Sequence, residues 1–263
     1  MDEINKINRE RWNALASANV EFSRPFFDYT IEKAAAYIYR YDIIKDVSGK
    51  KVLCLASGGG QDSVAFGLLS AKVTVMDLSD IQLARDQQAA AHHHLSIETI
   101  QGDMRDLSRF PDNSFDLVWQ PYSINFVPDV EPVYREVARV LKPGGIYYMQ
   151  FANPFVHTVD DEAWDGNAFP LNRAYMDGED TSTYFPHWDV SQVDGSSLKI
   201  DSPHEFRHTL STVLNTMAKC GFVFLYLQEY ILKDENPEPG SWVHFTQVAP
   251  PWFDSFWRLR EAA

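Results

Sequence analysis

The sequence predicts an α/β protein built on a mostly parallel β-sheet with helices on both faces. Between residues 51 and 151, short apolar segments typical of strands alternate with segments of helical spacing. The first apolar segment runs into three consecutive glycines and then into a helical segment. Since parallel strands must be joined by a long crossover, usually a helix, this alternation indicates a doubly wound sheet.

The expected elements follow in chain order. Residues 2–19 and 28–44 have helical spacing and are separated at Pro25, and Ser48-Gly49 ends this first part of the chain. Strands are then expected over residues 52–55, 72–78, 96–101, 115–120 and 146–151. The intervening helices are expected to end at Leu69 and to span residues 79–93 and 130–140.

Residues 153–205 interrupt the alternation of strands and helices. A segment this long without regular structure is usually functional when it lies inside a compact domain, so we interpret it as a cap over the site. Its aromatic residues either form a wall for a flat or cationic substrate or hold the cap onto the sheet. These residues are Phe155, Trp164, Phe169, Tyr175, Tyr184, Phe185 and Trp188.

After the cap, residues 207–222 are expected to form a helix and residues 223–231 a strand. Residues 242–253 are expected to supply a final strand, antiparallel beside the last two. We interpret the 263 residues as one domain. Its parts are an N-terminal helical lid (1–47), a core (48–152), an inserted cap (153–205) and a C-terminal helix with strands (206–263).

The composition narrows the classes of function. The formal net charge is -14, and the basic residues form no cluster. Because nucleic-acid binding needs a basic face, a nucleic-acid substrate is not expected. The polar N-terminus is not a secretory signal peptide, and no apolar run approaches the roughly 20 residues that cross a bilayer. We therefore expect a cytoplasmic protein that binds no membrane.

No metal site is expected. The two cysteines, Cys54 and Cys220, match neither a disulfide framework nor a zinc signature. Three adjacent histidines, His92-His93-His94, point in different directions around a helix, so at most two of them could share an ion. They lie at the expected C-terminus of that helix, where polar or cationic side chains suit the helix dipole, and we interpret them as a solvated helix end.

The strongest functional signal is the segment VLCLASGGGQDS at residues 52–63. Its glycines let the backbone turn sharply and approach a ligand, although a tight turn without a ligand is the alternative. Asp77 ends the next strand, 19 residues after Gly58, where a doubly wound fold has an acid that accepts both ribose hydroxyls. Asp77 or Ser79 could also cap the following helix, and both roles can coexist.

Three further positions bear on the type of nucleotide. Leu78 could pack against an adenine face. Asp103, which follows the third strand, can accept the amino hydrogens of adenine, or it is a turn residue. Ser63 stands where the dinucleotide fingerprint G-x-G-x-x-G needs glycine. These observations argue against a dinucleotide site.

In order, VLCLASGGGQDS, VTVMDLS, IQGDM, FDLVWQ and LKPGGIYYM resemble the motifs of class I S-adenosylmethionine-dependent methyltransferases, in particular the small-molecule branch called type 11. The resemblance covers residues 48–152 and, more loosely, 206–257. It implies a Rossmann-like, seven-stranded sheet with an antiparallel last strand, and S-adenosylmethionine as the cofactor. The family usually has an acid at the start of the first motif, where this chain has Ala56-Ser57, so no side-chain contact to the methionine amino group is implied.

The resemblance also implies which residues contact the cofactor. These are Ser57, Gly58, Gly59 and Gly60 as a backbone cradle for methionine and ribose, Asp77 at the ribose, Leu78 at the adenine, and Asp103 with the Met104 N–H at the adenine. Gln120 would lie near the methionine moiety or the transferring methyl group. Trp12 could close the pocket from the N-terminal segment, or it could only staple the N-terminal helices together.

The chemistry requires positioning above all, because methyl transfer from a sulfonium is an in-line displacement whose pre-organisation can contribute roughly 7–11 kcal/mol. An oxygen or ammonium nucleophile must also lose a proton to a nearby base. The candidate histidines in or beside the cap are His157, His187, His204 and His208. His157 is preferred because it follows a strand at the edge where open α/β sheets bind ligands, although any of them could be a histidine without a catalytic role. Tyr122 is expected in the pocket.

These observations predict an enzyme that methylates an oxygen or nitrogen atom of a small molecule and releases S-adenosylhomocysteine. A peptide or protein methyltransferase is one alternative and would have an open groove. A noncatalytic S-adenosylmethionine-binding protein is another, and its pocket would be too filled for an acceptor. An NAD-linked oxidoreductase is disfavoured by Ser63.

Overall fold

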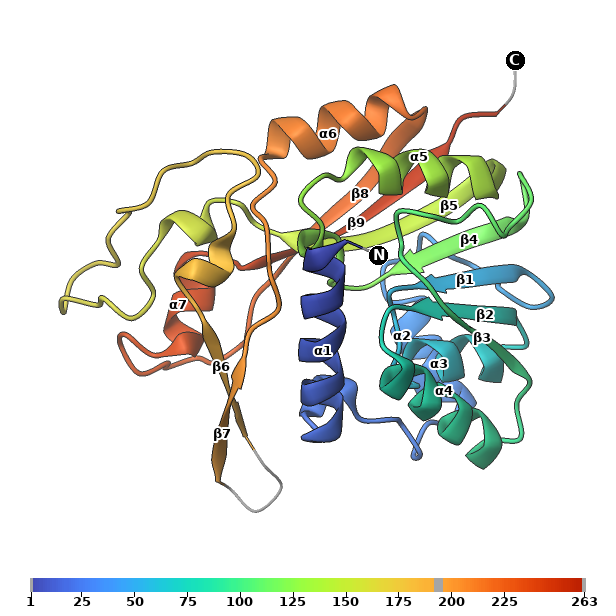
Figure 1. The fold of residues 1–263 in the computed structure, drawn as a ribbon, viewed down its shortest axis with the longest axis horizontal. Helices are drawn as coiled ribbons and strands as arrows, with labels where there is room; N and C mark the ends of the chain where they lie inside the picture. Colours follow the sequence, from blue (N-terminus) through green and yellow to red (C-terminus); the bar gives the residue numbers. More distant parts are fainter. Residues whose placement is uncertain (1, 192–195, 262–263) are drawn as a thin grey trace.

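The computed structural model describes residues 2–191 and 196–261. Within them, the main sheet has seven strands in the order β3-β2-β1-β4-β5-β9-β8 (Figure 1). Strands β3 to β5 in this order pair in parallel, whereas β9 is antiparallel to both of its neighbours. The predicted α/β class, with a doubly wound seven-stranded sheet and an antiparallel last strand, is confirmed. The strands are β1 (Lys51–Leu55), β2 (Lys72–Asp77), β3 (Ile97–Gln101), β4 (Phe115–Gln120), β5 (Leu141–Ala152), β8 (Phe222–Tyr230) and β9 (Trp252–Leu259).

Helices cover both faces of the sheet. On one face lie α2 (Ile31–Ile38), α3 (Asp62–Leu68) and α4 (Asp80–His92), and on the other lie α5 (Glu131–Val140) and α6 (Leu210–Lys219). Strand β1 contributes to the hydrophobic core on each face of the sheet. Val52 and Cys54 pack on the face covered by α2, α3 and α4, and Leu53 and Leu55 pack on the face covered by α5 and α6. Successive side chains of a strand point to opposite faces, so a strand buried on both sides is apolar throughout.

Helix α1 (Glu3–Ser17) stands across the carboxyl ends of the parallel strands, between the sheet and a two-stranded hairpin of β6 (His187–Ser191) and β7 (Ser197–Asp201) (Figure 1). The hairpin belongs to the segment that interrupts the alternation, and its pairing was not predicted. The remaining described residues of that segment are irregular apart from two short 3-10 helices, η3 (Val156–Thr158) and η4 (Thr181–Thr183). Two further 3-10 helices are η1 (Glu21–Ser23) and η2 (Ile124–Phe126).

The prediction of a strand over residues 242–253 is wrong. Residues Trp242–Val248 form helix α7, in which the Ser241 side chain caps a backbone N–H of the first turn. The alternating pattern of this segment imitates a strand. The true strand, β9, begins at the end of the predicted range and was hidden from the apolar pattern by Asp254 and Ser255, which are both fully buried.

Helix α2 is shorter than the predicted helix over residues 28–44. Thr30 caps its start by accepting a hydrogen bond from Lys33 N at 3.3 Å. The helix ends at Ile38, and the chain then turns through Asp42, whose φ of 59° is left-handed and cannot continue a helix. The left-handed turn therefore follows the end of the helix, although the helical spacing of apolar residues continues beyond it.

Candidate active site

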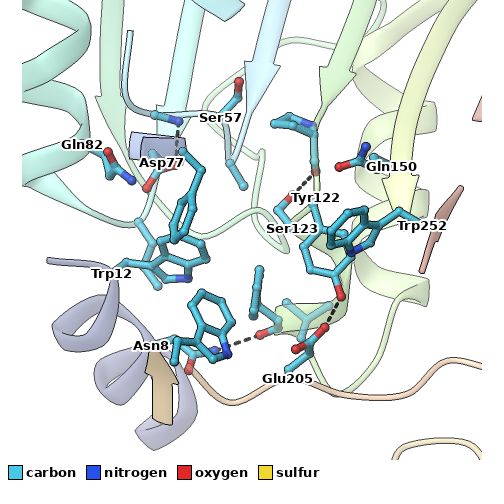
Figure 2. A pocket seen from close by; sticks show the side chains of 18 of the residues that line it. Asn8, Trp12, Ser57, Asp77, Gln82, Tyr122, Ser123, Gln150, Glu205 and Trp252 are labelled. Carbon is cyan, nitrogen blue, oxygen red and sulfur yellow. Dashed lines mark hydrogen bonds between the residues drawn. The ribbon is translucent and has the colours of Figure 1, made fainter. Parts of the chain in front are cut away.

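A cavity of about 1030 Å³ lies at the carboxyl edge of the sheet, where α/β folds bind ligands (Figure 2). We call the part beside the loops after β1, β2 and β3 the sheet half, and the part beside α7 and residues 153–205 the cap half. Pockets for one small ligand have volumes of roughly 300–1,000 Å³, so this cavity has room for a cofactor and an acceptor. The predicted site residues on its wall are Trp12, Ser57, Gly58, Asp77, Leu78, Asp103, Met104, Tyr122 and His157.

Gly58 forms the closest approach of the loop after β1 to its neighbours. Its N–H donates a hydrogen bond to Asp77 Oδ2 at 2.9 Å (Figure 2). A Cβ added to Gly58 would lie 2.6 Å from Gln82 Cβ and 3.0 Å from Asp77 Cγ. No other residue fits here without displacing α4 or the end of β2, so glycine is required by packing as well as by access to the cavity.

Gly59 and Gly60 do not line the cavity, in contrast to the predicted cradle. Their N–H groups donate to Asp86 Oδ2 and Oδ1 of α4, each at 3.0 Å. Gly60 has a φ of 77°, and an added Cβ would lie 2.9 Å from the Arg85 carbonyl oxygen. These two glycines therefore seat the loop against α4, behind the wall that Ser57 and Gly58 form.

Asp86 was not singled out from the sequence. Its side chain is fully buried and also accepts a hydrogen bond from Ser63 Oγ at 2.5 Å. Burial raises its pKa to about 7. The signal for this residue is its spacing, because it falls on the buried face of α4 with Leu83 and Ala90. An acid on the apolar face of a helix indicates a buried partner.

Of Asp77 and Ser79, the structure shows which residue caps the following helix. Asp77 lies on the cavity wall, and its Oδ1 accepts a hydrogen bond from Ser79 N at 2.8 Å. The Ser79 hydroxyl in turn caps α4 by accepting from Gln82 N at 3.1 Å. Burial raises the pKa of Asp77 above its ordinary value. The cap of the helix is thus Ser79, and the Asp77 carboxylate stays at the cavity.

Asp103 lies on the wall within a hydrogen-bonded cluster. Its carboxylate accepts from the backbone N–H and the guanidinium of Arg105, with distances of 2.7–3.1 Å, and from the Asn5 side-chain amide of α1. Arg105 also pairs with Asp2 at 2.8 Å. The start of α1 is therefore joined to the loop after β3 at the point where adenine is expected.

The middle of α1 reaches the cap half. Asn8 donates hydrogen bonds to the carbonyl oxygens of Phe126 and His204, both at 3.1 Å, and accepts one from His204 N at 2.6 Å. Trp12 lies on the wall with edge-to-face ring contacts to Phe126 and Trp188 at 5.1 and 6.0 Å. The indole thus forms part of the cavity wall, where Figure 2 shows it below Asp77.

Gln120 is fully buried and does not reach the cavity, in contrast to its predicted position beside the methionine moiety. Its amide donates to Ser123 Oγ at 3.0 Å, and its carbonyl oxygen accepts from the Tyr147 hydroxyl. Ser123 lines the cavity in its place (Figure 2). The residue at the strand end thus orients a hydroxyl group of the wall.

Glu205 is the main polar residue of the cap half that the sequence did not indicate. Its Oε1 accepts a hydrogen bond from the Tyr122 hydroxyl and lies 3.6 Å from His157 Nε2 (Figure 2). Burial raises the pKa of Glu205 to about 7. Burial, together with the charge of Arg207, lowers the pKa of His157 to about 3, so this histidine is neutral and a weak base at pH 7.

The other candidate histidines lie in less suitable positions. His187 is on the wall but is half exposed and pairs with Asp201 at 2.9 Å. His204 pairs with Asp180 at 2.7 Å, and His208 bonds the Val127 carbonyl oxygen at 2.9 Å. Neither His204 nor His208 lines the cavity.

The aromatic residues of the cap divide between the two roles proposed for them. Phe185 and Trp188 line the cavity. Trp164 and Phe169 instead pack against each other and against His244 and Phe245 of α7, with ring centroids 4.7–5.6 Å apart. Some rings therefore form the wall, and others hold the cap in place.

The histidine triplet at the end of α4 has structural contacts. His92 and His93 bond the carbonyl oxygens of Phe27 and Phe26 at 3.0 and 2.8 Å. Residues 2–191 and 196–261 contain no group of three or more His, Cys, Asp or Glu side chains arranged to hold a metal ion. Across the same part of the chain, every helix is too short or too polar to span a bilayer.

Comparison with known proteins identifies the family. The family model "Methyltransferase domain" matches residues 53–149. "Uncharacterized methyltransferase YbaJ" of Bacillus subtilis (strain 168) is 37% identical over 188 residues, which cover 69% of this chain and 71% of that protein. The chain belongs to the S-adenosylmethionine-dependent methyltransferases. The predicted enzyme class and cofactor are thereby confirmed.

Two further comparisons describe this methyltransferase. The solved structure of an S-adenosylmethionine dependent methyltransferase from Mesorhizobium loti matches it with a TM-score of 0.62 at 22% identity, over 89% of this chain and 100% of that one. "Sterol 24-C-methyltransferase ERG6B" of Gibberella zeae is 36% identical over 221 residues, which are 82% of this chain. The match spans only 50% of that relative, so the likeness does not extend to its whole length.

The sheet half fits S-adenosylmethionine. Gln82 Oε1 is buried at its wall and has no hydrogen-bond partner among the described residues, although buried polar atoms nearly always have one. Asp77 supplies a carboxylate, and Leu78 and Met104 supply apolar surface. A ribosyl adenine offers hydroxyl donors and a flat apolar face, which match this set of groups.

Proposed function

We propose that this methyltransferase transfers a methyl group from S-adenosylmethionine to an oxygen or nitrogen atom of a small-molecule acceptor. The observation that carries this proposal is the single cavity that joins the cofactor loops to the cap half. Rings from the cap, from α7 and from the ends of β8 and β9 line the cap half. A peptide or protein substrate would need an open groove, and a noncatalytic binder would have no room for an acceptor.

The residues of the sheet half bind and orient the cofactor. S-adenosylmethionine, when bound, supplies an electrophilic sulfonium methyl group. Asp77 would accept hydrogen bonds from the ribose hydroxyls, and Asp103 with the Met104 N–H would bind the adenine. Ser57 and Gly58 would hold the methionine part of the cofactor, and Trp12 would exclude water from the side of the N-terminal helix. The acceptor would then lie in the cap half, in line with the methyl group.

A carbon acceptor is the second candidate. The Gibberella zeae relative is named a sterol 24-C-methyltransferase, and the rings of the cap half offer an apolar surface of the kind that a ring system needs. The two candidates differ in the product. Methylation at oxygen or nitrogen removes an exchangeable hydrogen or raises the basicity of an amine, whereas methylation at carbon leaves both groups unchanged.

Calorimetric titration with S-adenosylhomocysteine, and with NADH as the comparison ligand, tests the cofactor. We expect micromolar binding of the first and no heat from the second. Turnover with S-adenosylmethionine that carries a trideuteromethyl group, analysed by mass spectrometry and NMR against a panel of small molecules, then identifies the acceptor atom. A folded protein that does not bind S-adenosylhomocysteine, or that labels only peptides, would refute the proposal.

A further inference from the structure

The cap half has an acidic wall, on which Asp189 pairs with Lys199 at 4.0 Å. Its wall includes the four acids Asp161, Glu162, Asp189 and Glu205. No Lys or Arg belongs to the cavity wall among the described residues. The acids of the sheet half, Asp62, Asp77 and Asp103, accept hydrogen bonds from neighbouring groups of the protein, whereas Asp161 in the cap half has a buried Oδ1 with no hydrogen-bond partner among the described residues. An acceptor of positive charge would complement this wall.

Glu205 is the acid best placed to contact an acceptor. Its side chain is 15% exposed, and its only hydrogen bond among the described residues is the one that Oε1 accepts from Tyr122. Oε2 therefore keeps its capacity to accept a donor from the cavity. Arg207 does not neutralise this carboxylate, because its guanidinium pairs with Glu179 and donates a hydrogen bond to the His157 carbonyl oxygen.

An aromatic cluster surrounds the same end of the cavity. It consists of Trp252 and three rings around it, Tyr122, Tyr230 and Trp242, at centroid distances of 6.2, 5.6 and 6.1 Å. All four residues line the cavity. Aromatic faces attract cations through the ring quadrupole, and several rings around one space form the usual cage for an ammonium group. Tyr122 joins this cluster to Glu205.

We propose that the acceptor is an organic amine whose ammonium group binds between Glu205 and the aromatic cluster. The inference rests on the proposed function and narrows it to nitrogen. Neutral alcohols would leave the carboxylate without a charged partner, and carboxylic acids would be repelled by the four acids of the cap half.

The same contact provides the proton transfer that methylation of an amine requires. The bound ammonium gives one proton to the Glu205 carboxylate and becomes a neutral amine. Its nitrogen lone pair forms the new N–C bond to the methyl group as the S–C bond breaks, and that bonding pair stays on sulfur. The products are a protonated N-methylamine and the neutral thioether S-adenosylhomocysteine, so charge and atoms balance.

Glu205 can take part in this transfer near neutral pH. The titratable and charged groups around it are Tyr122, His157 and Asp180, and the charge of Arg207 acts on His157. Burial raises its pKa to about 7, and His157 stays neutral, so protonation of Glu205 is the step that titrates. Since only the carboxylate form can accept the proton, the rate constant with an amine rises as pH increases through about 7.

Matched probes test the inference on the intact protein saturated with S-adenosylhomocysteine. Calorimetry compares 2-phenylethylamine, 2-phenylethanol and 3-phenylpropanoate, and the corresponding indole series. We expect each amine to bind at least tenfold more tightly than its alcohol. Glu205→Gln should weaken amine binding at least tenfold and leave S-adenosylhomocysteine binding within twofold. In separate turnover assays with S-adenosylmethionine, the same variant should lose the rise of the rate with pH. Glu229→Gln, an exposed residue of β8 away from the cavity, is the charge-matched control and should change neither.

The outcomes separate this inference from the proposed function. If S-adenosylhomocysteine binds but no amine binds better than its alcohol or acid counterpart, the amine inference is wrong while the methyltransferase function stands. An unchanged amine affinity in Glu205→Gln has the same meaning. Lack of S-adenosylhomocysteine binding would instead refute the proposed function. Should Glu205→Gln not fold, the selectivity of the unaltered protein still decides.

Discussion

Two carboxylates beside the glycine loop have different tasks. Asp86 is fully buried and bonds the N–H groups of Gly59 and Gly60, so it fixes the loop from behind. Asp77 lies on the cavity wall and bonds Gly58 N from the front. The loop is thus held in one conformation before any ligand binds, which reduces the entropy that binding must overcome.

Replacement of Asp77 by Ala tests the front contact. We expect binding of S-adenosylhomocysteine to weaken by about 1–3 kcal/mol, because the ribose hydroxyls lose a buried charged acceptor. Calorimetry measures the affinity, and thermal unfolding shows whether the loop survives. Asp112→Ala, an exposed acid that pairs with Arg139 and does not line the cavity, is the control and should leave the affinity unchanged. An unaltered affinity in Asp77→Ala would remove this residue from the ribose role.

Helix α1 is attached to both halves of the cavity wall by side-chain hydrogen bonds. Asn5 joins it to Asp103 in the sheet half, and Asn8 joins it to Phe126 and His204 in the cap half. The sheet strands, in contrast, are held by continuous backbone ladders. An element attached by a few side chains opens at lower free energy than a central strand, so α1 is the element that we expect to move when ligands enter.

Replacement of Asn8 by Ala tests this expectation. The variant loses three hydrogen bonds, each of which contributes about 0.5–1.5 kcal/mol. We expect S-adenosylhomocysteine to dissociate roughly tenfold faster and amide hydrogens of α1 to exchange faster, as stopped-flow and hydrogen-exchange mass spectrometry would measure. Lys6→Ala, at an exposed position of the same helix, is the control. Equal dissociation rates for the unaltered protein and Asn8→Ala would show that α1 does not retain the cofactor.

For the whole molecule, Asp254 joins the two ends of the chain to the core. It is 2% exposed and accepts hydrogen bonds from Arg40 and Tyr41 near the N-terminus, at 3.1 and 2.6 Å, and from Tyr148 of β5 at 2.8 Å. Asp254 is itself a residue of β9. Its carboxylate therefore couples this C-terminal strand to the N-terminal segment and to β5 in the sheet. We therefore expect the chain to unfold as one cooperative unit.

Asp254→Ala is expected to lower the free energy of unfolding by about 3–5 kcal/mol, because it leaves the partly buried Arg40 guanidinium, whose side chain is 23% exposed, without its charged partner. Urea unfolding followed by circular dichroism measures this loss. The matched control is Asp28→Ala, which removes an exposed pair with Lys33 and should lower the free energy of unfolding far less. A loss below 1 kcal/mol for Asp254, or two separate transitions, would contradict the coupling.

The wall residues of the sheet half could be predicted because the sequence patterns that mark them are local. The turn after β1, the acid at the end of β2 and the acid after β3 each follow a strand, and parallel strands bring their carboxyl ends to one edge. The same reasoning failed where packing decides the direction of a side chain. Gln120 ends β4 but turns to Ser123 and Tyr147, and Gly60 turns to α4, so neither reaches the cavity.

The sequence by itself determined the fold class, the glycine loop and the family, since these depend on apolar period, backbone freedom and residues close in the chain. Only the tertiary structure showed which residues come together in the cap half of the cavity. Glu205 meets Tyr122 across 83 residues, and Trp252 gathers rings from β8, α7 and the loop after β4. No periodicity or spacing in the sequence predicts contacts of this kind, because they depend on how the cap packs on the sheet.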